Sequence, residues 1–283
     1  MTQTTAFPVL PEIRFARIPL QSQVRYLGDR FSYLEAGPAD APCVLLLHGI
    51  GSNASYYRFQ FAALRARFRV VAWNAPGYWM SDNLKTEHPS DADYAQAVAD
   101  FTQALGMQQF VLCGNSFGSV VAQAFAIRHP QRVQRLILTG TGVGQRQVSP
   151  ERREKFEARA RRIRLGSYQY GDAGVDNLVG PQASSALRAM LVEVMRGTQA
   201  AGLLRAVSFR LSSFYTPDLA SALTMPVLLV QGSEDQVNPR QENADLLLPR
   251  LLNGRLVELP GIGHLPEVED PDALNRLLVD FVG

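Results

Sequence analysis

Apolar runs recur along this chain at intervals long enough to hold a helix, and this rhythm constrains the fold more than any other feature. A continuous apolar run is typical of a strand buried on both faces of a mostly parallel sheet. Such strands are expected at 43–47, 68–73, 110–113, 133–139, 227–230 and 255–259. Helical spacing is found at 91–105, 116–128, 240–248 and 271–282. The alternation predicts a doubly wound α/β sheet, and short alternating segments at 13–18 and 24–34, interrupted by Gly28 and Asp29, predict an antiparallel start.

One interval, 140–227, breaks this rhythm. A chain of 283 residues exceeds the usual domain length of roughly 100 to 150 residues, so either two domains or one domain with an insertion is expected. No strand is evident in the interval, whereas 150–165, 183–197 and 198–211 have helical character. Residues 141–226 hold 12 Lys or Arg and seven Asp or Glu, a net charge of +5 against −3 elsewhere. We therefore predict a helical cap at 141–224, inserted into a core formed by 1–140 and 225–283.

The overall composition excludes several classes of protein. The 28 Lys and Arg nearly balance the 26 Asp and Glu, so the net charge favours neither nucleic acid nor an anionic membrane as a partner. Two cysteines do not make a disulfide framework. The N-terminus resembles no signal peptide, and no apolar run approaches the ~20 residues of a membrane helix. We expect a cytoplasmic protein that acts as a monomer or homodimer.

The residues that most strongly indicate chemistry are Gly114-Asn115-Ser116-Phe117-Gly118. They follow the expected strand 110–113 and begin the expected helix that runs to Arg128, which is the strand–turn–helix context of a G-x-S-x-G nucleophile elbow. The glycines suit a sharp turn where a Cβ would collide with neighbouring chain. The helix N-terminus behind the serine favours negative charge there. Ser116 is therefore the candidate nucleophile.

A serine needs a base, and the base needs an orienting acid. Of four histidines, His264 lies in a loop between the last expected strand and the final helix, from which it can reach the carboxyl edge of the sheet. Asp235 follows the strand 227–230, in the chain order serine, acid, histidine. The adjacent Glu234 is not excluded by spacing. We predict Ser116, Asp235 and His264 as the catalytic residues, with Asp235 preferred over Glu234.

An oxyanion hole requires N–H donors where negative charge develops on the substrate. His48-Gly49-Ile50-Gly51 ends the first buried strand, at the edge where Ser116 is expected. The backbone N–H groups of Ile50 and Phe117 are the natural pair of donors. His48 is then expected to be a structural hydrogen-bonding residue beneath the loop, and not a catalyst.

With these four motifs in order, the sequence resembles the α/β-hydrolase superfamily, in particular the members with a helical cap between the sixth and seventh core strands. The resemblance covers essentially the whole chain. It implies a Ser-Asp-His hydrolase that acts through an acyl-enzyme, with no metal and no organic cofactor. The implied substrate is a small-molecule ester, lactone or dienoate.

Within that superfamily, Asn115 before the serine resembles the hydrolases of meta-cleavage products, which cut carbon–carbon bonds in dienoic acids. Those enzymes usually have tryptophan after the catalytic histidine, where this chain has Leu265, and more glycine in the oxyanion loop. Hydrolysis of a carboxylic ester or lactone is therefore the first expectation, and carbon–carbon bond hydrolysis is the alternative. A hydrolase-fold binding protein with a dormant triad is a third hypothesis.

Five side chains are candidate contacts to substrate. Asn115 and Asn53 are polar residues near the expected elbow and oxyanion loop. Trp79 stands where relatives usually have glycine, and either narrows the pocket mouth or packs beneath the cap. Arg205 and Arg210 lie in the basic cap, where they, or the nearby Arg188, could meet a substrate carboxylate.

Overall fold

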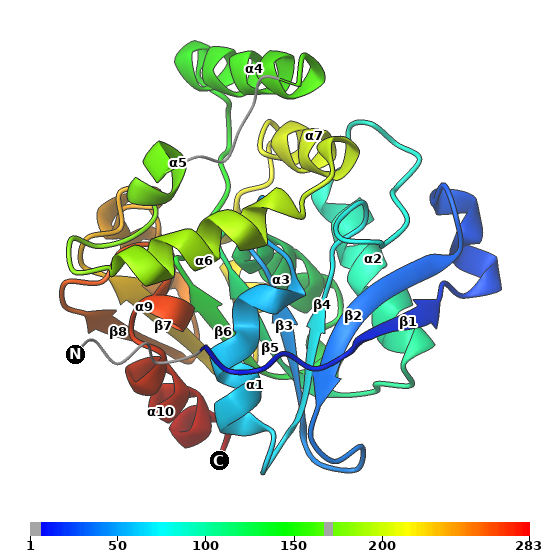
Figure 1. The fold of residues 1–283 in the computed structure, drawn as a ribbon, viewed down its shortest axis with the longest axis vertical. Helices are drawn as coiled ribbons and strands as arrows, with labels where there is room; N and C mark the ends of the chain where they lie inside the picture. The colour runs from blue at the N-terminus through cyan, green and yellow to red at the C-terminus, as the bar shows by residue number, and fades with distance from the viewer. Residues whose placement is uncertain (1–6, 167–171) are drawn as a thin grey trace.

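A single eight-stranded sheet organises the computed structural model, which describes residues 7–166 and 172–283 (Figure 1). The strands are β1 Ile13–Arg17, β2 Arg30–Ala36, β3 Cys43–Leu47, β4 Arg69–Trp73, β5 Phe110–Asn115, β6 Val133–Thr139, β7 Val227–Gly232 and β8 Gly254–Leu259. Their order in the sheet is β1-β2-β4-β3-β5-β6-β7-β8. From β4 to β8 all pairs are parallel, and β1, β2 and β4 pair antiparallel, so the predicted mostly parallel sheet with an antiparallel start is confirmed.

The second half of the expected antiparallel start differs from the prediction. Residues Leu20–Arg25 form a 3-10 helix, so the strand does not extend back to Val24 and β2 begins only at Arg30. Leu20 and Val24 are exposed, because no neighbouring strand covers them. Tyr26 instead turns inward and donates a hydrogen bond of 2.8 Å to Asp100. The alternation of apolar residues there reflects separate local contacts and not a pleated strand.

Helices cover both faces of the sheet. On one face, α2 Asp91–Ala104 and α3 Phe117–Arg128 pack together and share a core with β5 and β6. On the other face lie α1 Arg58–Leu64 and α10 Pro271–Val282, with the short α9 Pro266–Glu269 beside them. The chain thus has the helix–sheet–helix layers of a doubly wound fold.

The helix expected at 240–248 is broken into three short turns. They are Arg240–Glu242, α8 Ala244–Leu247 and Leu248–Arg250. Asn243 between the first two has φ −134° and ψ −82°, which is not helical, and Pro249 opens the third. Apolar residues keep a helix-like spacing in this segment because one side of each short turn still faces the core.

Among the described residues, four α-helices lie between β6 and β7, as the sequence predicts for an insertion. They are α4 Pro150–Arg164, α5 Asp172–Asp176, α6 Ser185–Arg196 and α7 Ala200–Phe209. Figure 1 shows them above the carboxyl edge of the parallel strands, with α4 uppermost. The bounds 141–224 for a separate cap stay a prediction. Among all the described helices, none has the length and apolar character needed to cross a membrane.

His48 fixes the loop that leaves β3. Its ring is fully buried, packs against Tyr78 with ring centroids 4.9 Å apart, and accepts a hydrogen bond of 3.1 Å from the N–H of Ala75 through Nε2. Nδ1 lies 2.8 Å from the carbonyl oxygen of Gly49 and donates to it. One nitrogen donates and the other accepts, so the ring must be neutral. Burial accordingly lowers the pKa of His48 from 6.5 to about 4.

Glycines allow close packing at the carboxyl edge. A Cβ on Gly118, in the first turn of α3, would lie 2.0 Å from the carbonyl oxygen of Leu47 at the end of β3. A Cβ on Gly114 would lie 2.3 Å from the carbonyl oxygen of Gly118. Helix α3 can therefore approach β3 and β5 this closely only with glycine at these positions.

We predict that Gly118→Ala destabilises the protein. The added methyl meets backbone atoms that cannot move independently, so the free energy of unfolding should fall by about 3 kcal/mol in urea titrations. Gly174→Ala is the control, because a Cβ at Gly174 meets nothing within 4 Å. It should change the unfolding free energy by no more than about 1 kcal/mol. Equal stability of the two variants would contradict the close packing.

His48 also predicts a pH dependence of stability. Because the folded pKa lies below the unfolded value, the neutral ring stabilises the fold above pH 6.5, and this stabilisation is lost as the pH falls toward 4. The unfolding free energy of the parent minus that of His48→Gln should therefore shrink by up to ~3 kcal/mol over this range. His88→Gln, at an exposed histidine, is the control. A difference that does not change with pH would show that His48 is not buried as a neutral ring.

Candidate active site

The turn between β5 and α3 presents Ser116 at the carboxyl edge of the sheet. Ser116 has φ 53° and ψ −114°, a left-handed conformation that is uncommon for a residue with a side chain. Its N–H donates a hydrogen bond of 3.0 Å to the carbonyl oxygen of Thr139, at the end of the neighbouring strand β6. The side chain, 8% exposed, lines two adjoining cavities beneath α4. The strained turn expected from Gly114 to Gly118 is therefore present.

Asp235 and His264 lie against each other although 29 residues separate them. Nδ1 of His264 is 2.8 Å from Oδ2 of Asp235, and the side chains of both are almost completely buried. Gln231 donates a second hydrogen bond to Oδ2, and the N–H groups of Val237 and Asn238 donate to Oδ1. These donors hold the carboxyl group of Asp235 in one orientation. The alternative acid, Glu234, is exposed and accepts a hydrogen bond from Ser233.

The second nitrogen of His264 is left available. Nε2 is buried and has no hydrogen-bond partner among residues 7–166 and 172–283. His264 and Ser116 line the same cavity. A Cβ on Gly140, at φ +48°, would lie 2.8 Å from the imidazole, so the end of β6 must be a glycine for the ring to fit. The neutral Nδ1–H tautomer that the Asp235 bond favours makes Nε2 a proton acceptor facing this space.

A buried carboxyl group that sequence reasoning missed lies directly behind the turn. Both oxygens of Glu267 accept hydrogen bonds, one from Thr139 and the other from Tyr56 at 2.7 Å and Asn115 at 3.4 Å. Complete burial raises the pKa of Glu267. Glu267, three residues after His264, thus links β6, the turn and the 3-10 helix Ala54–Tyr57. Glu267 lies in α9, a helix of only four residues, which is too short for its apolar residues to show a helical period in the sequence.

The backbone N–H groups of Ile50 and Phe117 are placed beside Ser116. Both residues line the second of the two cavities, together with Ser116 itself. The N–H of Ile50 donates no hydrogen bond to the backbone of any described residue. Phe117 is the first residue of α3, and the first four N–H groups of an α-helix lack carbonyl partners. The two predicted donors are thus available at one place.

The two cavities differ in their walls. The first holds about 380 Å³ and is lined by Lys155, Arg159 and Arg162 together with an apolar set, Leu178, Leu191, Val194, Met195 and Leu265. The second holds about 450 Å³ and is lined by Arg152, Lys155, Arg159 and Arg210, among other residues. Both cavities include Ile50 and Ser116 and both have cations in their walls, but only the first has this apolar set beside them.

Two of the candidate substrate contacts are engaged with the protein. Asn53 is buried and donates a hydrogen bond of 2.7 Å to the carbonyl oxygen of Val194 in α6, while its own oxygen accepts from Ser55. It therefore joins the oxyanion loop to the helical insertion and lines neither cavity. Asn115 does line the first cavity, but its amide nitrogen faces inward, 3.3 Å from the carbonyl oxygen of His264.

Trp79 and Arg205 also lie away from Ser116. Trp79 packs against the apolar core on the α1 side, close to Gly197 at the end of α6. The guanidinium of Arg205 donates to the carbonyl oxygens of Thr86, Ala201 and Lys85. Neither residue lines either of the two cavities. The nearby Arg188 donates to the carbonyl oxygen of Ala183 and pairs with Asp176. Of the candidate arginines, only Arg210 reaches the space beside Ser116.

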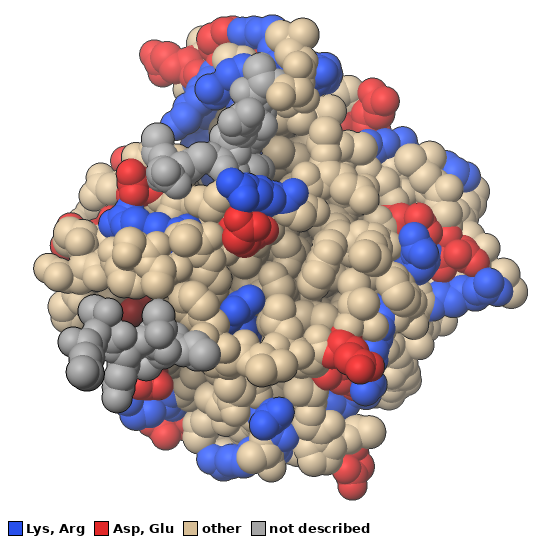
Figure 2. Space-filling view, in the orientation of Figure 1, with Lys and Arg blue, Asp and Glu red and all other residues tan. Residues whose placement is uncertain are grey.

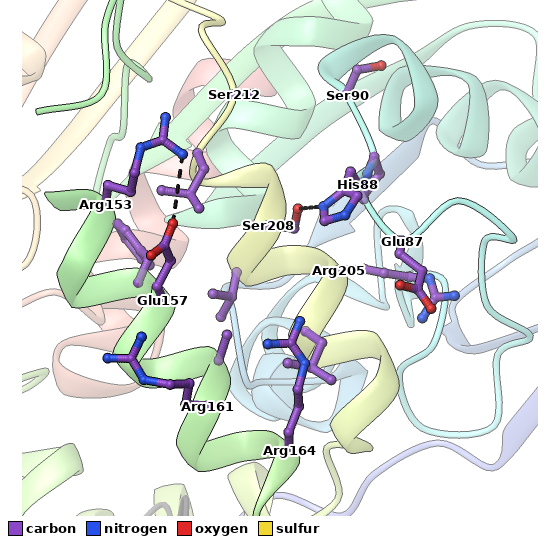
Figure 3. Close-up of a pocket in the computed structure, with 16 residues that line it drawn as sticks. Glu87, His88, Ser90, Arg153, Glu157, Arg161, Arg164, Arg205, Ser208 and Ser212 are labelled. Carbon is purple, nitrogen blue, oxygen red and sulfur yellow. Dashed lines mark hydrogen bonds and ion pairs between the residues drawn. The ribbon is translucent and has the colours of Figure 1, made fainter. Parts of the chain in front are cut away.

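Arg205 belongs instead to an outer cavity of about 650 Å³ between α4, α7 and the loop 87–90 (Figure 3). His88 and Ser208 are hydrogen-bonded at its rim, 2.8 Å apart. Arg153, Arg161 and Arg164 reach it from α4. Ser116, Asp235 and His264 are not among its lining residues. This cavity, although larger than the two at Ser116, therefore does not hold the candidate catalytic residues.

Comparisons with known proteins identify relatives of this chain. A family model described as the alpha/beta hydrolase fold matches residues 42–271. RutD of Klebsiella pneumoniae (strain 342), a carbamate hydrolase by name, is 27% identical over an alignment of 251 residues, and the match covers 85% of this chain and 91% of that protein. The 2-hydroxy-6-oxo-6-phenylhexa-2,4-dienoate hydrolase of Comamonas testosteroni is 27% identical over an alignment of 279 residues, and the match covers 95% of this chain and 96% of that one.

Among solved structures, a thermophilic esterase from Thermogutta terrifontis, determined with malate bound, superposes with a TM-score of 0.83 at 22% identity. The match covers 96% of this chain and 98% of the esterase. At that identity the likeness shows the fold alone. Because the family model matches most of the chain, we conclude that this protein belongs to the α/β-hydrolase family and is a hydrolase.

Proposed function

We propose that the protein hydrolyses a carboxylic ester or lactone of a small molecule through Ser116, His264 and Asp235, by way of an acyl-enzyme. The observation that carries this proposal is the hydrogen bond of 2.8 Å from His264 to Asp235, with Nε2 of the same ring unpartnered among the described residues beside the Ser116 cavity. A buried histidine held in this way is a general base aimed at one place.

In the proposed mechanism, Ser116 Oγ attacks the carbonyl carbon while Nε2 of His264 takes its proton. Asp235 holds the ring and stabilises the imidazolium that forms. The N–H groups of Ile50 and Phe117 bind the oxyanion of the tetrahedral intermediate. Collapse breaks the bond to the alcohol oxygen, which receives the proton from His264 and leaves the acyl group on Ser116. Water, deprotonated by the same nitrogen, then releases the acid.

Carbon–carbon bond hydrolysis is the second candidate function. The identity of 27% to a dienoate hydrolase over almost the whole chain favours it, as does Asn115 before the serine. Leu265 stands against it, because it follows His264 where a tryptophan is usual in that group. The inward-facing amide of Asn115 also serves the turn itself, which accounts for its presence without a role in substrate binding.

We predict that Ser116→Ala lowers kcat/KM for short acyl esters by at least 1,000-fold, because the nucleophile is lost while the binding site is kept. The variant should also lose labelling by a fluorophosphonate probe. Ser208→Ala, which removes a hydroxyl from the outer cavity, is the control and should keep parent activity. Full activity of Ser116→Ala would overturn the mechanism.

The choice between the candidates is tested by assaying a chromogenic dienoic meta-cleavage product beside short acyl esters. We expect ester hydrolysis to have the higher kcat/KM. Much faster dienoate cleavage would replace the ester proposal with the carbon–carbon one. Saturable ligand binding with no turnover and no labelling of Ser116 would favour a binding protein with a dormant triad.

A further inference from the structure

Helix α4 carries two faces of different character. Arg152, Lys155, Arg159 and Arg162 are spaced three, four and three residues apart, so they form one stripe along the helix. All four line the cavities beside Ser116. Arg153, Arg161 and Arg164 lie on the other face, toward the outer cavity (Figure 3). Figure 2 shows Lys and Arg side chains gathered over α4 at the top of the molecule.

The inner face differs from the outer one in how its charge is balanced. On the outer face Arg153 pairs with Glu157 and Arg161 pairs with Glu154. On the inner face, Arg152 and Lys155 form no salt bridge with any described Asp or Glu, and Nε of Arg152 is buried without a hydrogen-bond partner. No acidic residue of the described chain lines either cavity at Ser116. Arg152 and Lys155 therefore place positive charge beside the candidate nucleophile, with no described acidic residue in either cavity.

Arg210 adds a further positive charge to this cavity from α7, on the side opposite α4. It follows the last turn of α7 and lines the second cavity with Arg152 and Arg159. The pKa of Arg210 is lowered to about 10, first by burial and then by the positive charges of Arg152 and Arg159. Its guanidinium forms no ion pair with a described residue. Cations held this close repel one another, and an anion between them would relieve that repulsion.

Apolar residues attach α4 to the rest of the insertion. Helix α4 is attached to α7 by a small apolar cluster of Phe156, Ile163, Leu203 and Val207, and Ile50 packs against the same cluster. The guanidinium of Arg152 lies over the ring of Phe156, 5.6 Å from its centroid, so one cation of the stripe also contacts this cluster. That contact neutralises no charge, so Arg152 and Lys155 can still bind an anion.

From this arrangement we propose that the substrate carries a compact anionic group, a carboxylate or a phosphate, that binds in the cation-lined cavity while its reacting carbonyl lies at Ser116. Arg152, Lys155 and Arg210 contact the anion, and an apolar part of the substrate extends into the cavity lined by Leu191 and Met195. The proposal deepens the esterase function and rests on it, because it places the anion relative to the same serine.

The test compares esters of matched length and different charge. Monomethyl adipate carries a carboxylate, methyl heptanoate is its neutral counterpart, and methyl 6-aminohexanoate carries a positive charge. 3-Acetoxypropyl phosphate beside pentyl acetate repeats the comparison for phosphate. At low ionic strength we expect kcat/KM for at least one anionic ester to exceed that of its neutral counterpart by at least tenfold, as for a charge-assisted hydrogen bond. Added salt should reduce this preference.

Variants assign the preference to the inner face. Arg152→Gln and Arg210→Gln should each reduce kcat/KM for the preferred anionic ester about tenfold more than kcat/KM for the neutral ester. Arg164→Gln makes the same substitution on the outer face of α4 and should change neither. Thermal unfolding of each variant checks that the fold is intact.

The inference is overturned if no anionic ester is preferred, if the preference survives both inner variants, or if Arg164→Gln reduces it equally. If hydrolysis depends on Ser116 but neutral and anionic esters react equally well, the anion site is wrong and the proposed function still holds. If no ester is hydrolysed, calorimetry with adipate decides. Binding weakened tenfold by Arg210→Gln but not by Arg164→Gln supports the anion site without the esterase function, and absence of binding overturns the site.

Discussion

The close approach of backbone segments at the carboxyl edge of the sheet is the constraint on which the site depends. Gly118 lets α3 begin against β3, and this contact holds Ser116 at φ 53°. Strain of this kind persists only where the surrounding structure leaves the chain no alternative. Three further constraints surround it, namely the bond to Thr139, the buried carboxyl group of Glu267 and the neutral ring of His48. The serine is thus placed by packing beneath it before any substrate arrives.

The candidate catalytic residues were predictable because each is tied to a local pattern. Ser116, Asp235 and His264 all follow strands, and parallel strands bring their carboxyl ends to one edge. A short motif between a strand and a helix therefore predicts both the backbone conformation of its central residue and the position of that residue at the carboxyl edge of the sheet. The same reasoning predicted most of the sheet, and it was wrong at Val24, where local contacts imitate the alternation of a strand.

The substrate contacts were less predictable, because residue type does not show what a long polar side chain will contact. Asn53 and Arg205 are chemically suited to bind substrate, yet backbone carbonyls of α6, α7 and the loop 85–86 accept their hydrogen bonds. The inner stripe of α4 had a readable signal in the spacing of Arg152, Lys155, Arg159 and Arg162. Only the structure shows that this face, and not the one bearing Arg164, turns toward Ser116. The orientation of a helix attached by a small apolar cluster depends on tertiary contacts.

Two parts of the helical insertion accordingly have different roles. Helix α6 is anchored to the core, since Val194 accepts the hydrogen bond of Asn53 and apolar residues of α6 share a cluster with β3 and β4. Helix α4 is held by the smaller apolar cluster and carries Arg152 and Lys155, which line the cavity at Ser116. Substrate selection in this account depends on α4 and Arg210, whereas the chemistry depends on the core.

The central claim is that Ser116 carries the acyl group during turnover. It is tested most directly by rapid acid quench of the protein during ester hydrolysis, followed by peptide mass spectrometry. The account predicts a mass increase equal to the acyl group on the peptide that contains Ser116, rising within the first turnover. Steady hydrolysis with the acyl group on another residue, or on none under conditions where deacylation limits the rate, would contradict it.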